Sequence, residues 1–267
     1  MRSDWPADLA SRFIPPSMVV REQTFDLSKP LGTAQTMRVG FASDFHAGPT
    51  TPLKTIELAC AALRDAAPDL MLFGGDFVSL RGRDAARLLA PLRELEAPLG
   101  KFAVLGNHDL WSNPAPVLDV LERAGVTHLH NAGVVLPPPF ERTMVVGLDD
   151  HLSGTPDASG IAWNPELTTV LLIHQPTGLL DAAGRPFDLA FAGHTHAGQV
   201  VLPGGIALVV PEGALSRRYL YGRYMVAPAQ HLFVSGGVGN STIPIRLGVP
   251  PEVVICTVNG TACQPPA

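Results

Sequence analysis

The chain has 267 residues, 46% of them hydrophobic, and a formal net charge of -5 at pH 7. This length fits one large α/β domain with a substantial core, and the hydrophobic content argues against a disordered chain. The negative charge disfavours broad electrostatic binding to nucleic acid, but it is compatible with a small phosphate pocket in which bound metals dominate the local field.

The N-terminal region is proline-rich and weakly patterned, so we predict an N-terminal extension over residues 1–36. Its apolar segments at 13–16 and 18–20 either pack on the domain or touch a membrane surface. The N-terminus lacks the apolar run of a secretory signal, and no apolar run reaches the ~18–20 residues that span a bilayer. We therefore expect a cytoplasmic protein, with peripheral contact to the inner membrane face left open.

The first half of the chain alternates strands with helices. A buried strand is expected at 37–42, and a helix follows in which Pro52 takes the first helical position behind Thr51 as its cap. The remaining elements of this half are strands at 69–73 and 102–105 and helices at 85–92, interrupted near Pro91, and at 116–124. This alternation is typical of parallel βαβ units.

The second half is richer in strands, which short loops connect. Strands are expected at 133–136, 143–148, 168–173, 188–192, 199–202, 206–210, 224–227, 231–234 and 252–258. The change of character predicts an α/β fold with two packed, mixed β-sheets flanked by helices. We place this single domain at residues 37–260, followed by a short C-terminal tail at 261–267.

Side chains with nitrogen or oxygen donors follow five of these apolar strands. They are Asp44 with His46, Asp76, Asn107 with His108, His174, and His194 with His196. In open α/β sheets ligands bind beyond the carboxyl ends of the strands, so we expect these side chains to meet at one edge. Residues two apart in an extended backbone point the same way, which predicts that Asp44 converges with His46. Such donors suit Mn, Fe, Zn or Co, and the sequence does not choose among them.

The order and spacing of these motifs resemble the calcineurin-like metallophosphoesterase superfamily, whose pattern is D-x-H, G-D, G-N-H-D/E, H and G-H-x-H. Within it, residues 193–199, 236–239, 244–246 and 250–252 resemble the YaeI/YkuE-type bacterial phosphodiesterases. The resemblance implies a four-layer αββα sandwich and two metal ions, Mn, Fe or Zn. By this resemblance, one metal would take Asp44, His46, Asp76 and His196, and the other would take Asp76, Asn107, His174 and His194.

The resemblance also implies a metal-dependent phosphohydrolase, most closely a phosphodiesterase or pyrophosphatase, in which a metal-bridging hydroxide attacks phosphorus in line. His108 would donate a proton or a hydrogen bond to the leaving oxygen, and Asp109 would orient His108 as a carboxylate orients an imidazole. Similar enzymes cleave the pyrophosphate of UDP-2,3-diacylglucosamine. The expected substrate is therefore a small-molecule or lipid-linked phosphoester.

Three other functions share part of this pattern. The same kind of site serves phosphomonoesters and phosphoproteins. A non-catalytic protein-binding scaffold is disfavoured, because every expected ligand is present. An oxidative di-iron enzyme would need carboxylate-rich ligation on helices, whereas these ligands follow strands. The sequence does not determine the physiological substrate, the oligomeric state or the role of residues 1–36.

A basic and aromatic cluster over residues 217–224 follows the last histidine pair. Arginine suits bidentate phosphate binding, so we predict that Arg217, Arg218 or Arg246 contacts a distal group of the substrate. The alternative is a surface hairpin whose arginine stems cover aromatic rings. Asp150 either shapes the substrate site or lies in a solvated loop.

Overall fold

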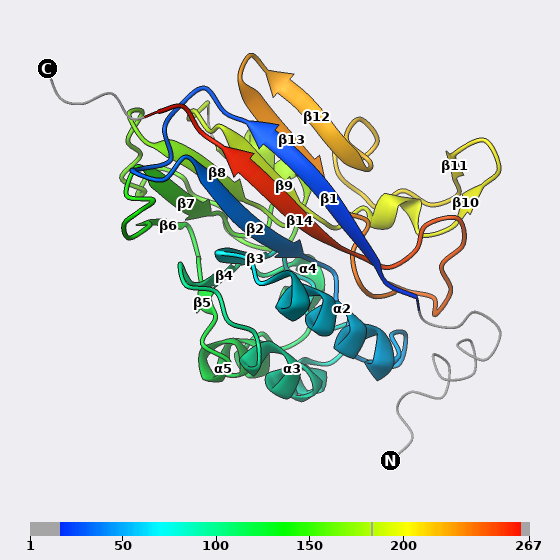
Figure 1. Ribbon diagram of the computed structural model, residues 1–267. Helices are drawn as coiled ribbons and strands as arrows, with labels where there is room; N and C mark the ends of the chain where they lie inside the picture. Colours follow the sequence, from blue (N-terminus) through cyan, green and yellow to red (C-terminus); the bar gives the residue numbers. More distant parts are fainter. Residues whose placement is uncertain (1–16, 183, 263–267) are drawn as a thin grey trace, which may run out of the picture.

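Two six-stranded sheets form the centre of the molecule (Figure 1). The computed structural model describes residues 17–182 and 184–262. The apolar segment predicted at 13–16 lies outside the described residues, as do residues 263–267 of the predicted tail. Within the described ranges, the helices are too short or too polar to span a bilayer.

The first sheet has the strand order β1-β14-β2-β3-β4-β5. Its strands are β1 (Val19–Asp26), β14 (Glu252–Asn259), β2 (Thr36–Ala42), β3 (Leu70–Phe73), β4 (Lys101–Ala103) and β5 (Thr127–His128). The strands β2 to β5 run parallel, and β14 is antiparallel to β2. Parallel neighbours need crossover connections, which the helices of the first half provide.

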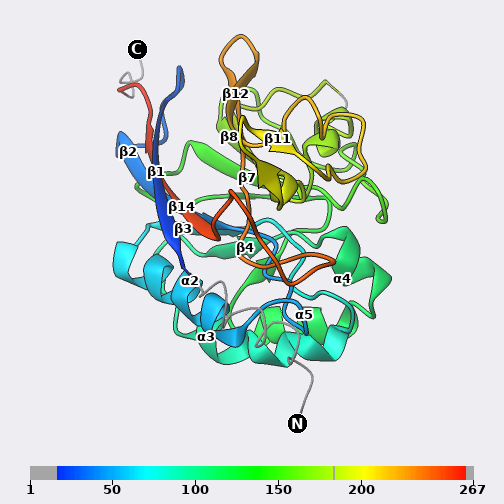
Figure 2. The ribbon, with the colours of Figure 1, turned by 90° about the vertical axis from the view of Figure 1, so that its right-hand side faces the viewer.

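Helices cover the outer face of the first sheet, as Figure 2 shows for α2 (Leu53–Ala66), α3 (Leu89–Arg93) and α5 (Ala115–Arg123). Ile56, Leu92 and Val120 of these helices share one buried cluster with Met71 and Phe73 of β3. The apolar face of each helix is thus buried against the sheet, which is where most helical stability in proteins arises.

Two helix starts differ from the prediction. Pro52 is the N-cap residue of α2 and not its first helical residue, and no side chain caps it. The hydroxyl of Thr51, predicted as the cap, accepts a hydrogen bond from the amide of Asn240 at 3.0 Å. The helix predicted at 85–92 is divided into the 3-10 helix η1 (Gly82–Arg87) and α3. Pro91 lies in the first turn of α3, where its missing N–H costs no hydrogen bond.

The second sheet has the strand order β12-β13-β9-β8-β7-β6. Its strands are β12 (Gly222–Ala227), β13 (Gln230–Val234), β9 (Leu189–Ala192), β8 (Thr168–Leu172), β7 (Thr143–Gly147) and β6 (Ala132–Val135). The four central strands are parallel and the two edge strands antiparallel. Loops and the 3-10 helix η2 (Pro176–Leu180) lie between β8 and β9. The predicted fold class of two mixed sheets with flanking helices is confirmed.

The two sheets pack through a shared apolar core. Phe41 of β2 and Val254 of β14 belong to the same buried cluster as Leu172 of β8 and Phe191 of β9. The rings of Phe41 and Phe191 have centroids 5.1 Å apart. This packing brings the carboxyl ends of the parallel strands of both sheets together, and the predicted donor side chains follow those ends.

Strand β1 lies in the stretch that the sequence assigns to an N-terminal extension. It pairs in parallel with β14, from Val19 opposite Glu252 to Asp26 opposite Asn259. Its residues are mostly half-buried or exposed, and it includes charged side chains, so the apolar pattern gives little sign of it. The described part of the predicted extension therefore contributes an edge strand to the first sheet.

Candidate metal centre

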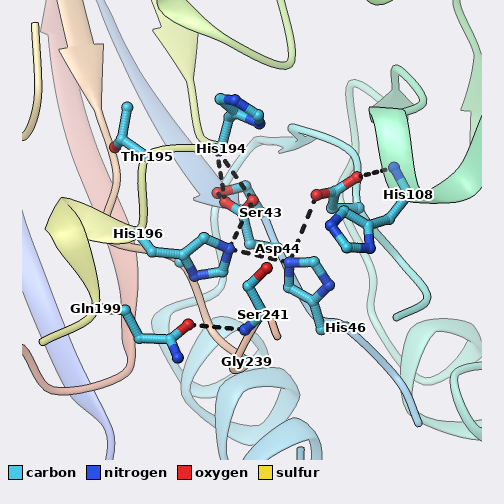
Figure 3. Close-up of polar contacts among 12 residues, drawn as sticks. Ser43, Asp44, His46, His108, His194, Thr195, His196, Gln199, Gly239 and Ser241 are labelled. Atoms are coloured by element: carbon cyan, nitrogen blue, oxygen red, sulfur yellow. Dashed lines mark hydrogen bonds and ion pairs between the residues drawn. The ribbon is translucent and has the colours of Figure 1, made fainter. Parts of the chain in front are cut away.

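Donor side chains from five loops meet at the carboxyl ends of β2, β3, β4, β8 and β9. Figure 3 shows Asp44, His46, His108, His194 and His196 of this set. The structure brings together every metal ligand predicted from the sequence. All seven are buried: Asp44, His46, Asp76, Asn107, His174, His194 and His196. Buried charged groups need partners or cations, so this concentration of carboxylates and imidazoles is unlike an ordinary core.

The predicted ligands form two clusters, and a third group of donors, His46, Asp76 and His108, joins them. One contains Asp44, His46 and His196, and the other contains Asp76, His174 and His194, with ligand atoms within 4.8 Å of one another in each. Asp76 Oδ2 lies 3.5 Å from His46 Nε2 and 3.4 Å from His174 Nε2. One carboxylate therefore reaches imidazoles of both clusters, and the donors fit a pair of cations.

Asn107 joins the second cluster through its side-chain oxygen. Its Oδ1 lies 3.1 Å from His174 Nε2. Asn107 is the first residue of α4 (Asn107–Trp111), which begins directly after β4 and its short loop. An amide oxygen is a neutral donor, so Asn107 adds a ligand to this cluster without adding charge.

Backbone carbonyls orient two of the imidazoles. His174 Nδ1 lies 2.6 Å from the carbonyl oxygen of Gly74, and His194 Nε2 lies 3.0 Å from that of Glu212. A ring nitrogen that donates to a carbonyl leaves the other nitrogen as the potential metal ligand. His174 then offers Nε2 and His194 offers Nδ1.

The backbone at the ligands is left-handed and not extended. The φ angles are 56° at Asp44, 45° at His46, 54° at Asp76, 69° at His194 and 51° at His196. The ligands converge, but the extended geometry that we expected from their spacing is wrong. Non-glycine residues rarely adopt this conformation, and such strain concentrates at functional sites.

Two glycines make room for the carboxylates. A Cβ atom on Gly106 would lie 2.2 Å from Asp76 Oδ1, and one on Gly193 would lie 2.3 Å from Asp44 Oδ2. No side chain fits at either distance. Glycine is therefore required at both positions, because the Asp76 carboxylate lies against Gly106 and the Asp44 carboxylate lies against Gly193.

Burial favours the neutral forms of His46 and His194, and it raises the pKa of Asp44. It lowers the pKa of His46 to about 3 and that of His194 to about 4, and it raises the pKa of Asp44 to about 6. Burial alone would also raise the pKa of Asp76, but the nearby His174 and His46 hold it well below its usual value. Neutral His46 and His194 beside an ionised Asp76 are in the protonation states that bind cations. His174 differs, because Asp76 raises its pKa in spite of burial.

His108 lies beside the ligands and faces a cavity of about 670 Å³. Its backbone amide donates to Asp76 Oδ1 at 2.9 Å, and its ring Nδ1 lies 2.7 Å from the carbonyl oxygen of Ser79. The ring centroid is 4.7 Å from that of His46. The residue is thus fixed next to the cluster, with its ring directed by a carbonyl.

The direct pairing predicted between Asp109 and the His108 ring is replaced by other contacts. The Asp109 carboxylate accepts hydrogen bonds at 3.0 Å from the amides of Gly106 and Val78. Burial raises its pKa to about 7. Asp109 caps the first turn of α4 and so supports His108 through the backbone, not through the imidazole.

Arg246 lies behind the ligands and not in the cavity where a substrate contact was predicted. It is buried, and its Nη2 lies 3.0 Å from His196 Nδ1. The same nitrogen donates to the carbonyl oxygens of Gly236 and Gly239 at 2.6 and 2.7 Å. Arg246 therefore braces His196 and the loop 236–239.

The other two predicted substrate arginines also lie outside the cavity lining. Arg217 is exposed, and the Arg218 guanidinium lies 5.2 Å from the centroid of the Tyr219 ring. The Arg218 contact agrees with the alternative prediction for residues 217–224, a surface hairpin in which arginine side chains cover aromatic rings. Asp150 is buried, and its Oδ1 accepts from Gln175 Nε2 at 2.9 Å, so it belongs to the packed loop next to His174.

Ser43 and Thr195 are polar site residues that the motif pattern did not single out. Ser43 Oγ donates to Asp44 Oδ2 at 2.6 Å, and Thr195 Oγ1 donates to the carbonyl oxygen of Leu220 at 2.7 Å. The amide of His194 also donates to Asp44 Oδ1 at 3.0 Å. Ser43 and Thr195 are sequence neighbours of predicted ligands, and this adjacency is the signal that could have identified them.

Comparisons with known proteins agree with this geometry. A family model described as calcineurin-like phosphoesterase matches residues 37–198. The uncharacterized metallophosphoesterase YkuE of Bacillus subtilis is 27% identical over 94% of this chain and 89% of its own length. An uncharacterized metallophosphoesterase of Aquifex aeolicus is 31% identical, over 90% and 92% respectively. The phosphodiesterase YaeI of Escherichia coli is 32% identical, over 83% and 82%.

Proposed function

The chain belongs to the calcineurin-like phosphoesterase family, and on this premise we propose that it is a phosphodiesterase or pyrophosphatase for a small-molecule or lipid-linked phosphoester. Its family and its donor clusters make it a metal-dependent phosphoester hydrolase. The observation that carries the narrower proposal is the cavity lining. The described lining residues include no lysine or arginine, which suits a singly charged diester better than a doubly charged monoester.

The proposed metal ligands follow the two clusters. Asp44, His46, Asp76 and His196 would hold one cation, and Asp76, Asn107, His174 and His194 would hold the other. Bound cations would neutralise charge on the phosphoryl oxygens and lower the pKa of water. Ligands without a thiolate suit Mn, Fe or Zn.

The chain's own residues supply orientation and a proton. His108 is proposed to hydrogen-bond or protonate the leaving oxygen, because its ring lines the cavity beside Asp76. The carbonyl oxygen of Ser79, 2.7 Å from His108 Nδ1, directs Nε2 as the nitrogen that meets the substrate. Asp109 holds the first turn of α4, on which His108 sits.

The test is a substrate panel with the metal-replete enzyme. It compares bis-p-nitrophenyl phosphate, p-nitrophenyl phosphate and a UDP-linked diacylglucosamine, each with Mn²⁺, Fe²⁺ or Zn²⁺. We expect a higher kcat/KM for the diesters than for the monoester. A preference for the monoester would make the protein a phosphomonoesterase.

The matched variants are Asp76→Asn and Asp119→Asn. Asp76 lies between the donor clusters, whereas Asp119 is an exposed carboxylate on α5. We expect Asp76→Asn to lose metal and activity together, and Asp119→Asn to keep both. Full activity in Asp76→Asn would contradict the proposed centre. Inactivity of the metal-replete native protein towards every ester would favour the scaffold alternative.

A further inference from the structure

The cavity beside the predicted metal ligands is lined by two chemically different sets of residues. One set carries nitrogen and oxygen donors and consists of Asp76, Asn107, His108, His194 and His196. The other set is apolar, and we call it the apolar wall: Trp111, Leu152, Val209, Pro211 and Ile243. A molecule with a phosphoryl group at the donor set can therefore bring a second group against the apolar wall.

The apolar wall is unusually exposed. The exposed fraction is 64% for Trp111, 66% for Val209 and 48% for Ile243. Contiguous exposed apolar surface is costly in water, and it commonly marks a binding site. Because this wall lines the same cavity as the proposed phosphoester site, we expect its occupant to be part of a molecule that also carries a phosphoryl group.

The charges of the lining restrict that occupant further. Glu212 also lines the cavity, and the described lining contains no lysine or arginine. An anionic group placed against the apolar wall would therefore have no counter-charge among these residues. An uncharged apolar group is the chemistry that fits.

A side chain of the metal-ligand turn fixes one part of the wall. Gln199 follows His196 by three residues, and its Nε2 donates to the carbonyl oxygens of Ile243 and Ile245 at 3.0 and 3.1 Å. Its Oε1 accepts from the amide of Ser241 at 2.8 Å, as Figure 3 shows. The loop that carries Ile243 is therefore held at a set position relative to the ligand His196.

Trp111 of the apolar wall packs against His108, the proposed acid. Trp111 and His108 lie on the same short helix, α4, and their ring centroids are 4.9 Å apart. A substituent on a phosphoryl group next to His108 therefore lies close to Trp111. Ile243 and Val209 line the same cavity as Trp111.

We propose that the apolar wall binds an alkyl or acyl chain of the phosphodiester substrate. This inference rests on the proposed function and deepens it, because it names which part of the substrate is recognised outside the metal centre. Each methylene that leaves water contributes about 0.8 kcal/mol, or roughly a fourfold change in an equilibrium constant. Chain length should therefore control both binding and kcat/KM.

The experiment uses alkyl p-nitrophenyl phosphodiesters with methyl, butyl and octyl groups, below their micelle concentrations, with Mn²⁺. We expect kcat/KM to rise by about tenfold or more from methyl to octyl. In Ile243→Glu and Val209→Glu the octyl-to-methyl ratio should fall towards one, and in Ile243→Leu it should be kept. Met225→Glu is the matched control, because Met225 is 68% exposed on β12 and does not line the cavity.

Calorimetry with methylphosphonate and octylphosphonate gives a readout that needs no turnover. We expect octylphosphonate to bind at least about tenfold more tightly to the native protein, and this difference to vanish in Ile243→Glu. Equal kcat/KM across the esters and equal dissociation constants would overturn the apolar wall while leaving the phosphodiesterase intact. If no ester is hydrolysed, the proposed function fails, and the two dissociation constants alone decide the inference.

Discussion

The Nε2 atoms of His46 and His196 lie 3.0 Å apart in the candidate metal centre. Burial lowers the pKa of both rings, so both imidazoles are uncharged at neutral pH. Two neutral imidazoles at this distance share at most one hydrogen bond, whereas a cation accepts a lone pair from each. Asp76 Oδ2, 3.5 Å from His46 Nε2, supplies the negative charge that such a cation needs.

Metal removal should destabilise the protein. Treatment with EDTA leaves the facing imidazoles and buried carboxylates without their cation, and adding Mn²⁺ at 100 times its Kd restores about 2.7 kcal/mol. The measurement is the Tm by scanning calorimetry, with metal content checked by mass spectrometry. A Tm that stays constant while the bound metal falls to zero would rule out metal binding by the native fold.

Metal affinity should rise with pH. Burial opposes the charge of His174, but Asp76 more than offsets it and raises the pKa of His174 well above its ordinary value in the metal-free protein. A cation must displace that proton, so affinity is lower where His174 stays protonated and higher as pH increases. Calorimetric Mn²⁺ titrations at pH 6, 7 and 8 in buffers of different ionisation enthalpy test this. Affinity that falls over this range, without proton release, would contradict the prediction.

His108→Asn should lower kcat by about 10²- to 10⁴-fold, the usual contribution of a positioned acid, and leave metal content intact. The readouts are steady-state kinetics on a diester and metal analysis. His130→Asn is the control, because the His130 side chain is 56% exposed and lies outside the cavity lining. Loss of metal in His108→Asn would show that the residue is a ligand.

Gly106→Ala should displace Asp76, because its Cβ would lie 2.2 Å from Asp76 Oδ1 and 2.7 Å from His174 Cε1. We expect a drop in metal affinity of about 10- to 100-fold, comparable to the loss of a ligand-orienting contact. Gly160→Ala is a matched control, since a Cβ there meets no atom within 4 Å. Equal Mn²⁺ affinities in the two variants would show that the close approach of Gly106 is not required.

Arg246→Met should destabilise the protein by about 3 kcal/mol, because it leaves buried carbonyl oxygens without donors. Burial lowers the pKa of Arg246 to about 10, so the guanidinium stays charged at neutral pH. The measurement is urea unfolding in EDTA, which separates this effect from metal binding. The exposed Arg217→Met should change the free energy of unfolding by less than about 0.5 kcal/mol. Similar values for both variants would remove the bracing role of Arg246.

The convergence of the predicted metal ligands could be predicted because their signal is local. Asp44 and His194 each follow an apolar strand, and strand ends in parallel sheets meet at a common edge. The structure joins them directly, through the amide of His194 and the carboxylate of Asp44. The left-handed turns that aim these side chains could not be predicted, because they depend on how both sheets pack around the site.

Features that depend on distant segments were the ones missed. The sequence suggests Arg246 as a substrate contact, whereas the structure buries it and its guanidinium donates to the carbonyl oxygens of Gly236 and Gly239. The Asp109 carboxylate accepts hydrogen bonds from the backbone amides of Val78 and Gly106 and not from the His108 ring. In both cases a buried polar group was satisfied by main chain, which side-chain patterns do not record.

The pairing of β1 with β14 has a consequence for synthesis of the protein. β1 is at the edge of its sheet, and its neighbour there is formed by residues 252–259. During translation β1 leaves the ribosome long before β14 exists, so its amides and carbonyls stay open to other nascent chains. Termination before residue 252 would make that exposure permanent, and such truncated chains should accumulate as aggregates.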